Sequence, residues 1–208
     1  MPSLENKSIR IINHFSDVTQ LSERILGNKG WHYGTYPGLL GNADPSWHIH
    51  LCGSRDLRDR SLYDNVLHAA PDLEALDELW SSVRDELAPD YGLVRAYANG
   101  HTYGQEGIPH RYAKPSDREL VAVLCLNHEW KDAWAGEMVF YDPANECVSV
   151  RPRPGRLILL DGAITRASRQ PSRDCPTLCM TLSFHMRPMN FRKDSQCANK
   201  RGSENVSL

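Results

Sequence analysis

The chain contains no apolar run that approaches the roughly 20 residues needed to cross a lipid bilayer. Its N-terminal segment, residues 1–7, also lacks the apolar core of a secretory signal peptide. The net charge of −2, from 24 basic and 26 acidic residues, argues against a general nucleic-acid binder, because such proteins carry a concentrated basic face. These absences predict a cytoplasmic protein that binds neither a membrane nor nucleic acid.

The six cysteines lack the spacing of a disulfide framework, so we expect a reducing compartment. Cys175 and Cys179 are four residues apart, but Pro176 and the strand pattern that follows do not suit a helical metal-binding pair. No matching pair of cysteines elsewhere in the sequence would complete a zinc site. We therefore expect no zinc site at this position.

The length of 208 residues suits one domain with a complete hydrophobic core. A hydrophobic content of 40% and a charged content of 24% are typical of soluble globular proteins, and no internal repeat is visible. We expect a single domain over residues 1–188, followed by a polar, aperiodic and flexible tail at 189–208.

Apolar periodicity predicts helical support over residues 15–90. A short helix is expected after Asp17, and the clearest helix lies between Asp72, which can cap its start, and Pro89, which ends it. Its apolar stripe at helical spacing consists of Leu73, Leu76, Leu79, Trp80, Val83 and Leu87. Residues 31–70 are rich in glycine, proline and aromatics and contain few periodic runs.

After Asp90 the pattern changes to short strands separated by turn residues. Strands are expected at residues 9–12, 93–103, 120–126, 137–141, 147–150, 156–160 and 178–185. Many short strands at regular spacing, preceded by helices, favour a mainly β fold in which two sheets form a jelly roll with flanking helices. The expected barrel core covers residues 93–186.

Several short motifs follow one another in the second half of the chain. They are the segment from Tyr97 to Tyr112, Leu126-Asn-His-Glu-Trp130, Trp134-Ala-Gly-Glu137, Pro154-Gly-Arg156 and Asp161-Gly-Ala-Ile-Thr-Arg166. In this order they resemble the prolyl-4-hydroxylase-like branch of the Fe(II)/2-oxoglutarate-dependent oxygenases. The resemblance spans most of the chain and is most specific over residues 97–184. It implies a double-stranded β-helix, a cupin-like jelly roll with iron in its mouth.

The resemblance also implies which residues stand at the iron site. The family holds iron with a histidine, a carboxylate two residues later and a distant histidine, which leave open positions for co-substrate and oxygen. In this sequence His110 matches the first ligand, Tyr112 replaces the carboxylate and Arg166 replaces the distant histidine. A neutral phenol is a poor iron ligand near pH 7, and a guanidinium cannot be deprotonated to bind a metal. We therefore expect a degenerate triad without iron.

The co-substrate position is altered as well. Where the family carries an arginine that binds the distal carboxylate of 2-oxoglutarate, this sequence reads Cys179-Met-Thr-Leu182. A thiol cannot replace a bidentate, charge-assisted ion pair. We therefore expect neither Fe(II) nor 2-oxoglutarate as a cofactor.

The altered residues still form a chemically useful set. Imidazole can act as a base or acid near neutral pH, phenol can donate a proton, and guanidinium can bind an anionic substrate. We predict that His110, Tyr112 and Arg166 catalyse metal-independent isomerisation, cyclisation, elimination or addition in small-molecule biosynthesis. Four further residues are expected at the substrate-binding cavity, namely Tyr97, Asn99, Tyr103 and Cys179.

A second interpretation is a non-catalytic protein. Tyr112 and Arg166 would then fill and neutralise the pocket, with Arg166 paired to Glu106 or Asp161. Such a chain could support an active oxygenase as a partner subunit, in a heterodimer with an intact paralogue. A homodimer is equally compatible with the sequence.

A third interpretation keeps the Fe(II)/2-oxoglutarate hydroxylase activity with non-standard ligands. His48 and His50 would face the same side of a strand and could join His110 in a three-histidine site. His101 also precedes His110 closely. His185 is not expected at the site, because at ~3.3 Å per residue it lies about 20 Å further along its strand than the family's co-substrate position.

Overall fold

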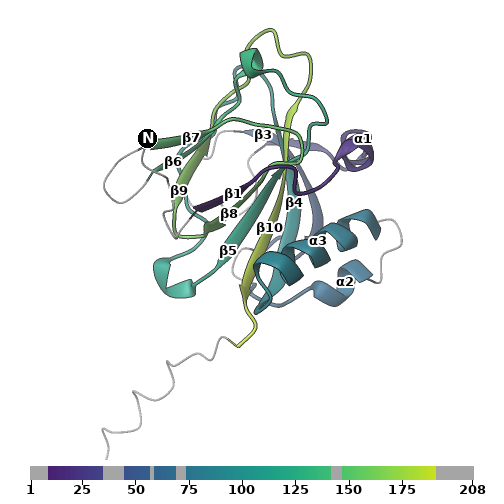
Figure 1. The fold of residues 1–208 in the computed structure, drawn as a ribbon, viewed down its shortest axis with the longest axis vertical. Helices are drawn as coiled ribbons and strands as arrows, with labels where there is room; N and C mark the ends of the chain where they lie inside the picture. Colours follow the sequence, from purple (N-terminus) through teal and green to yellow (C-terminus); the bar gives the residue numbers. More distant parts are fainter. Residues whose placement is uncertain (1–8, 35–44, 57–58, 69–73, 142–146, 191–208) are drawn as a thin grey trace, which may run out of the picture.

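The computed structural model describes residues 9–34, 45–56, 59–68, 74–141 and 147–190, and these form a mainly β protein with flanking helices (Figure 1). The strands are β1 (Ile9–Ile12), β2 (His32–Gly34), β3 (Ser46–Gly53), β4 (Tyr91–His101), β5 (Leu120–Cys125), β6 (Met138–Tyr141), β7 (Cys147–Val150), β8 (Leu157–Asp161), β9 (Thr165–Ser168) and β10 (Cys179–Pro188). The α-helices are α1 (Thr19–Leu26), α2 (Asp64–His68) and α3 (Glu74–Leu87), with 3-10 turns at Pro115–Asp117 and Asp132–Trp134. No helix in the described segments is long and apolar enough to span a lipid bilayer.

The strands form two antiparallel sheets. The larger sheet has the order β1-β8-β5-β10-β4-β3-β2, and the smaller has the order β7-β6-β9. Most neighbours, such as β1 and β8 or β4 and β10, are far apart in the sequence, which is typical of a jelly roll rather than a meander. The predicted fold class is confirmed.

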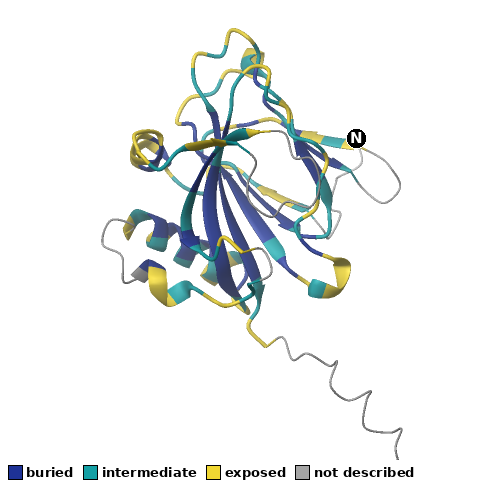
Figure 2. Ribbon diagram, turned by 180° about the vertical axis from the view of Figure 1, so that it is seen from behind, coloured by how far each residue is buried: buried dark blue, intermediate teal, exposed yellow. Residues whose placement is uncertain are grey.

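One face of the larger sheet is apolar and carries the helices. On β10, Leu182 and Phe184 are fully buried on this face, because side chains alternate between the two faces of a strand. The ring of Trp80 on α3 packs 5.7 Å from the ring of Phe184. Figure 2 shows the resulting layer, with the central strands buried and the solvent side of the helices exposed.

The other face of the larger sheet points into the jelly roll and is divided into an apolar and a polar half. The apolar half lies on β5 and β8 and consists of Val121, Val123, Cys125, Ile158 and Leu160. It packs against three residues of the smaller sheet, namely Met138, Phe140 and Val150. The polar half lies on β10, β4 and β3 and carries Thr181, Ser183, His185, Tyr97, Asn99 and His48. The predicted site residues on β4 belong to the polar half.

Four elements escaped the sequence prediction: β2, β3, α2 and β9. Strand β3 alternates Trp47, Ile49 and Leu51 with His48 and His50, but it lies in a segment rich in glycine, proline and aromatics for which no strand was predicted. Strand β9 has only four residues and contains a buried arginine, Arg166. The predicted helix cap Asp72 and most of the predicted tail lie outside the described residues.

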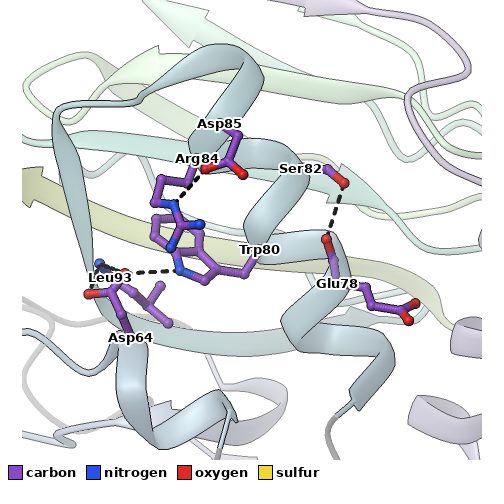
Figure 3. A network of polar contacts seen from close by, with 7 residues as sticks. All are labelled: Asp64, Glu78, Trp80, Ser82, Arg84, Asp85 and Leu93. Atoms are coloured by element: carbon purple, nitrogen blue, oxygen red, sulfur yellow. Dashed lines mark hydrogen bonds and ion pairs between the residues drawn. The ribbon is translucent and has the colours of Figure 1, made fainter.

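One carboxylate joins the start of α2 to β4 and α3. Asp64 accepts a hydrogen bond from the indole Nε1 of Trp80 at 3.0 Å and from the backbone N–H of Leu93 at 3.2 Å (Figure 3). The backbone N–H of Tyr63 donates to the carbonyl of Leu93 at 2.7 Å, which completes the link to β4. Asp64 thereby provides an acceptor for a donor of the buried Trp80 and for a strand N–H.

Replacing Asp64 with alanine is expected to lower the free energy of unfolding by about 1–3 kcal/mol, because the indole N–H of Trp80 and the N–H of Leu93 lose their acceptor. Urea denaturation followed by circular dichroism measures this loss. The control is Asp85→Ala, which breaks an exposed ion pair with Arg84 and should leave the midpoint nearly unchanged. Equal midpoints for the two variants would contradict the role of Asp64.

Candidate functional site

His110 and Arg166 lie opposite each other across two backbone hydrogen bonds. The N–H of His110 donates to the carbonyl of Arg166 at 2.9 Å, and the N–H of Arg166 donates to the carbonyl of His110 at 2.8 Å. Directly paired residues of an antiparallel bridge place their side chains on the same face. Two of the three predicted catalytic residues are therefore neighbours.

The ring of Tyr112 is the centre of a cluster that we call the Tyr112 cluster: His110, Tyr112, Arg166, His185 and Tyr97. The guanidinium of Arg166 lies 4.5 Å above the ring of Tyr112, in cation–π contact. The rings of His110 and His185 meet that ring edge-on, at centroid distances of 5.3 Å and 4.2 Å. A hydrogen bond of 3.0 Å joins the hydroxyl of Tyr97 and Nε2 of His185.

Arg166 is a buried cation, with only 3% of its surface exposed. Its guanidinium donates to the sulfur of Met138 at 3.8 Å, and its Nε has no hydrogen-bond partner within the described part of the chain. Burial lowers the pKa of Arg166, although the interaction with Tyr97 acts in the opposite direction. An arginine stays protonated in proteins, so this site holds a positive charge whose burial cost is not offset by a carboxylate among the described residues.

The predicted ion pair between Arg166 and Glu106 or Asp161 does not form. Glu106 instead forms a short ion pair with Arg169, at the surface. Asp161 accepts a hydrogen bond from the N–H of Ala163 at 2.8 Å, within its own turn. Both carboxylates therefore bind groups other than Arg166, and the guanidinium of Arg166 stacks on the ring of Tyr112 instead.

His110 is held as a neutral imidazole. Its Nδ1 lies 2.9 Å from the carbonyl of Ile108, which can only accept, so Nδ1 carries the proton and Nε2 keeps its lone pair. Burial and, second, the charge of Arg166 lower the pKa of His110 to about 4. The same two causes lower the pKa of His101, on β4, to about 4.

The four predicted cavity residues are placed differently. Tyr97 belongs to the Tyr112 cluster, and Asn99 faces the interior from the same side of β4. Cys179 is buried at the start of β10, where its thiol donates to the carbonyl of Gly136 at 3.9 Å and burial raises its pKa. Tyr103 lies apart, because 53% of its surface is exposed and Arg173 stacks on its ring at 5.3 Å.

Among the histidines proposed as alternative metal ligands, His101 lies near enough to His110 to interact with it electrostatically, whereas His48 and His50 contact backbone carbonyls on β3. His48 lies with Nδ1 3.4 Å from the carbonyl of Ser46, and His50 lies with Nε2 2.8 Å from the carbonyl of Gly53. No group of three histidine, cysteine, aspartate or glutamate side chains that could hold a metal ion occurs among the described residues. The suggested three-histidine site is therefore not formed in this part of the chain.

Sequence reasoning missed His185. The sequence places His185 about 20 Å along β10 from Cys179 at ~3.3 Å per residue, whereas the ring of Tyr112 reaches His185 from a different segment of the chain. The available signal was strand parity: His185 lies on the same face of β10 as Ser183 and Thr181, and it is only 5% exposed. A buried polar residue on the interior face is a candidate site residue wherever it lies along the strand.

No protein-family model matches the sequence, and no curated protein matches it. Solved structures do match. A 2OG-Fe(II) oxygenase family oxidoreductase from Burkholderia pseudomallei is 15% identical with a TM-score of 0.65, covering 88% of this chain and 87% of its own. A prolyl-4-hydroxylase from Pseudomonas putida is 14% identical with a TM-score of 0.57, covering 87% and 92%.

A third similar structure is SnoN, a non-heme alpha ketoglutarate dependent epimerase from nogalamycin biosynthesis. It is 12% identical with a TM-score of 0.59, and the match covers 87% of this chain and 76% of that chain. These three likenesses establish the fold: the chain is built like the 2OG-Fe(II) oxygenases and prolyl-4-hydroxylases. The fold implied by the sequence resemblance is thereby confirmed.

Proposed function

We propose that this oxygenase-fold protein is a metal-independent enzyme that performs acid/base chemistry on a small anionic molecule. The observation that carries the proposal is Arg166, a buried guanidinium without a carboxylate partner among the described residues, held opposite His110. A bound anion would offset the cost of burying this charge. Arg166 would thus hold the substrate beside the imidazole of His110.

The side chains around His110 do not suit iron. Arg166 stands in the paired position, and its fixed positive charge would repel a divalent cation. The neutral ring of Tyr112 lies where the family would supply a carboxylate, between His110 and His185. At the co-substrate position, the buried neutral thiol of Cys179 cannot form an ion pair with 2-oxoglutarate. We therefore derive no step that passes through iron or 2-oxoglutarate.

In the proposed reaction, Nε2 of His110 removes a proton from a carbon next to the substrate's carboxylate or carbonyl group. The electron pair of the broken C–H bond moves onto the substrate oxygens, where Arg166 stabilises the added negative charge. The hydroxyl of Tyr112, which is buried without a hydrogen-bond partner among the described residues, then returns a proton at another carbon or on the other face. The result is an isomerisation or epimerisation that needs no oxidant.

Substrate binding would also improve His110 as a base. The charge of Arg166 is one of the two causes that lower the pKa of His110. An anion on Arg166 offsets that charge and so raises the pKa of His110 toward its usual value. The base would therefore gain strength only once the substrate is in place.

The test is hydrogen exchange in D2O. The wild-type protein, with EDTA present, is incubated with a mixture of small carboxylic acids, and mass spectrometry measures deuterium bound to carbon. We expect exchange in at least one acid, its loss in His110→Gln and Arg166→Gln, and its retention in Arg169→Gln, which alters an exposed arginine. Exchange that requires Fe(II) and 2-oxoglutarate, or oxygen consumption with succinate release, would overturn the proposal.

A second candidate function is the non-catalytic partner subunit. It is favoured by the stacking of Arg166 on Tyr112, since the two side chains fill the position of the family's metal ligands. The exchange experiment separates the two functions. No exchange in any acid, together with a stable dimer in size-exclusion chromatography, would favour the partner subunit.

A further inference from the structure

A row of polar side chains crosses the interior face of the larger sheet from β10 to β2. Thr181 is paired with Asn99, Asn99 with His48, and His48 with His32. Directly paired residues of neighbouring antiparallel strands point to the same face. We call these four residues the polar row; it ends at the edge strand β2, where the rings of His48 and His32 are 6.3 Å apart.

The polar row adjoins the Tyr112 cluster, because Asn99 lies two residues from Tyr97, which is joined to His185 by a hydrogen bond, and His185 packs against the ring on which Arg166 stacks. The charge of Arg166 acts on both Tyr97 and His101. These two residues flank Asn99 on the same face of β4, each about 7 Å away along the strand. A ligand whose anionic end binds Arg166 therefore has Asn99 within reach of its next few atoms.

Two side chains of the polar row, Asn99 and Thr181, are available to a ligand. Asn99 and Thr181 are half-buried, and neither the amide nor the hydroxyl bonds to another side chain or backbone group among the described residues. Burial lowers the pKa of His48, so its imidazole is neutral at pH 7 and offers hydrogen bonding rather than charge. Asn99, Thr181 and His48 thus present neutral polar groups.

The opposite direction from Arg166 is closed. The apolar half of the interior, on β5 and β8, is packed against Phe140 of the smaller sheet, and Val123 and Ile158 have no exposed surface. An apolar chain attached to the anion would find no room there. If the apolar chain lay across the polar row instead, it would remove water from the polar side chains there without replacing the hydrogen bonds that water makes to them.

We infer that the substrate is a polar carboxylate whose tail carries hydroxyl or amide groups and lies across Thr181, Asn99 and His48. This inference rests on the proposed function, because Arg166 supplies the binding site for the carboxylate. The polar row would select the substrate by its tail, and acyl or aryl carboxylates of the same length would be disfavoured.

Calorimetry with gluconate and hexanoate tests the inference, since both are carboxylates with the same number of carbon atoms. We expect gluconate to bind wild-type protein at least about tenfold more tightly than hexanoate, because a pair of hydrogen bonds is worth about that much. Asn99→Leu and the nearly isosteric Thr181→Val should each reduce the gluconate affinity about threefold, because each removes one of the pair of hydrogen bonds, and leave that of hexanoate unchanged. The control is Thr19→Val, at an exposed position at the start of α1.

The outcomes separate the two proposals. If hexanoate binds as tightly as gluconate, or if Asn99→Leu and Thr181→Val keep the gluconate affinity while remaining folded, the polar-tail inference fails and the anion site stands. If neither acid binds the wild-type protein, or if Arg166→Gln binds both acids as well as wild type, the anion site itself fails. Thermal unfolding of each variant confirms that it is folded.

Discussion

The double variant Tyr112→Asp/Arg166→His is expected to bind Mn(II) at least about 100-fold more tightly than the wild-type protein, because removing a guanidinium near a divalent cation relieves several kcal/mol of repulsion. The backbone bridge between His110 and Arg166 holds positions 110 and 166 opposite each other, so two imidazoles would project to the same face. An aspartate two residues after His110 would complete a two-histidine, one-carboxylate donor set. Calorimetry with Mn(II) under anaerobic conditions measures the affinity.

Two controls define what this result would mean. Tyr112→Asp alone keeps the guanidinium and should stay without measurable affinity, and adding His110→Gln to the double variant should abolish binding. Wild-type protein that binds Mn(II) as tightly as the double variant would show that Arg166 does not oppose a metal. The metal-independent function would then be wrong at its central point.

The second large effect is a loss of stability between pH 6.5 and pH 4. Burial holds the pKa of both His101 and His110 at about 4, below the usual 6.5. Below pH 6.5 the unfolded chain therefore binds protons that the folded chain excludes. The free energy of unfolding consequently decreases as the pH is lowered from 6.5, and it levels off near pH 4. A depression of this size corresponds to about 3 kcal/mol for each imidazole. Urea midpoints measured across this range test the prediction.

The variant His101→Gln/His110→Gln should lose the part of this decline that these two imidazoles contribute, whereas His128→Gln, at an exposed position, should keep all of it. A further part remains in the double variant, because burial also lowers the pKa of His185. Carboxylates with a lowered pKa, such as that of Asp85, lose their contribution only at lower pH. An unchanged slope in the double variant would mean that these imidazoles are not buried as neutral groups.

The sequence predicted elements that show clear apolar periodicity or an apolar run. Helix α3 was found from a stripe that includes Trp80, and β5 from a run of apolar residues that is buried on both faces. Strand β3 was not predicted although Trp47, Ile49 and Leu51 alternate with His48 and His50, because this short run lies in a segment rich in glycine, proline and aromatics. Strands β4 and β10 also carry polar side chains on the interior face and were predicted, so a polar interior by itself does not conceal a strand.

A different limit applies to the site. The order of the motifs placed His110 and Arg166 at corresponding family positions, and the structure makes them a bridged pair. The sequence could not show that Arg166 stacks on Tyr112 instead of pairing with Glu106, because a side chain's partner depends on which segments meet.

By itself, the sequence determined the jelly-roll class and singled out His110, Tyr112 and Arg166 as candidate site residues, since periodicity and motif order are local properties of the chain. Only the tertiary structure decided that His185 lies against Tyr112, that Tyr103 lies outside the cluster, and that a polar row leads away from Arg166. The reason is physical: burial, charge compensation and strand register arise between segments that are distant in sequence, and each sets the pKa or the availability of a side chain only after the sheets have formed.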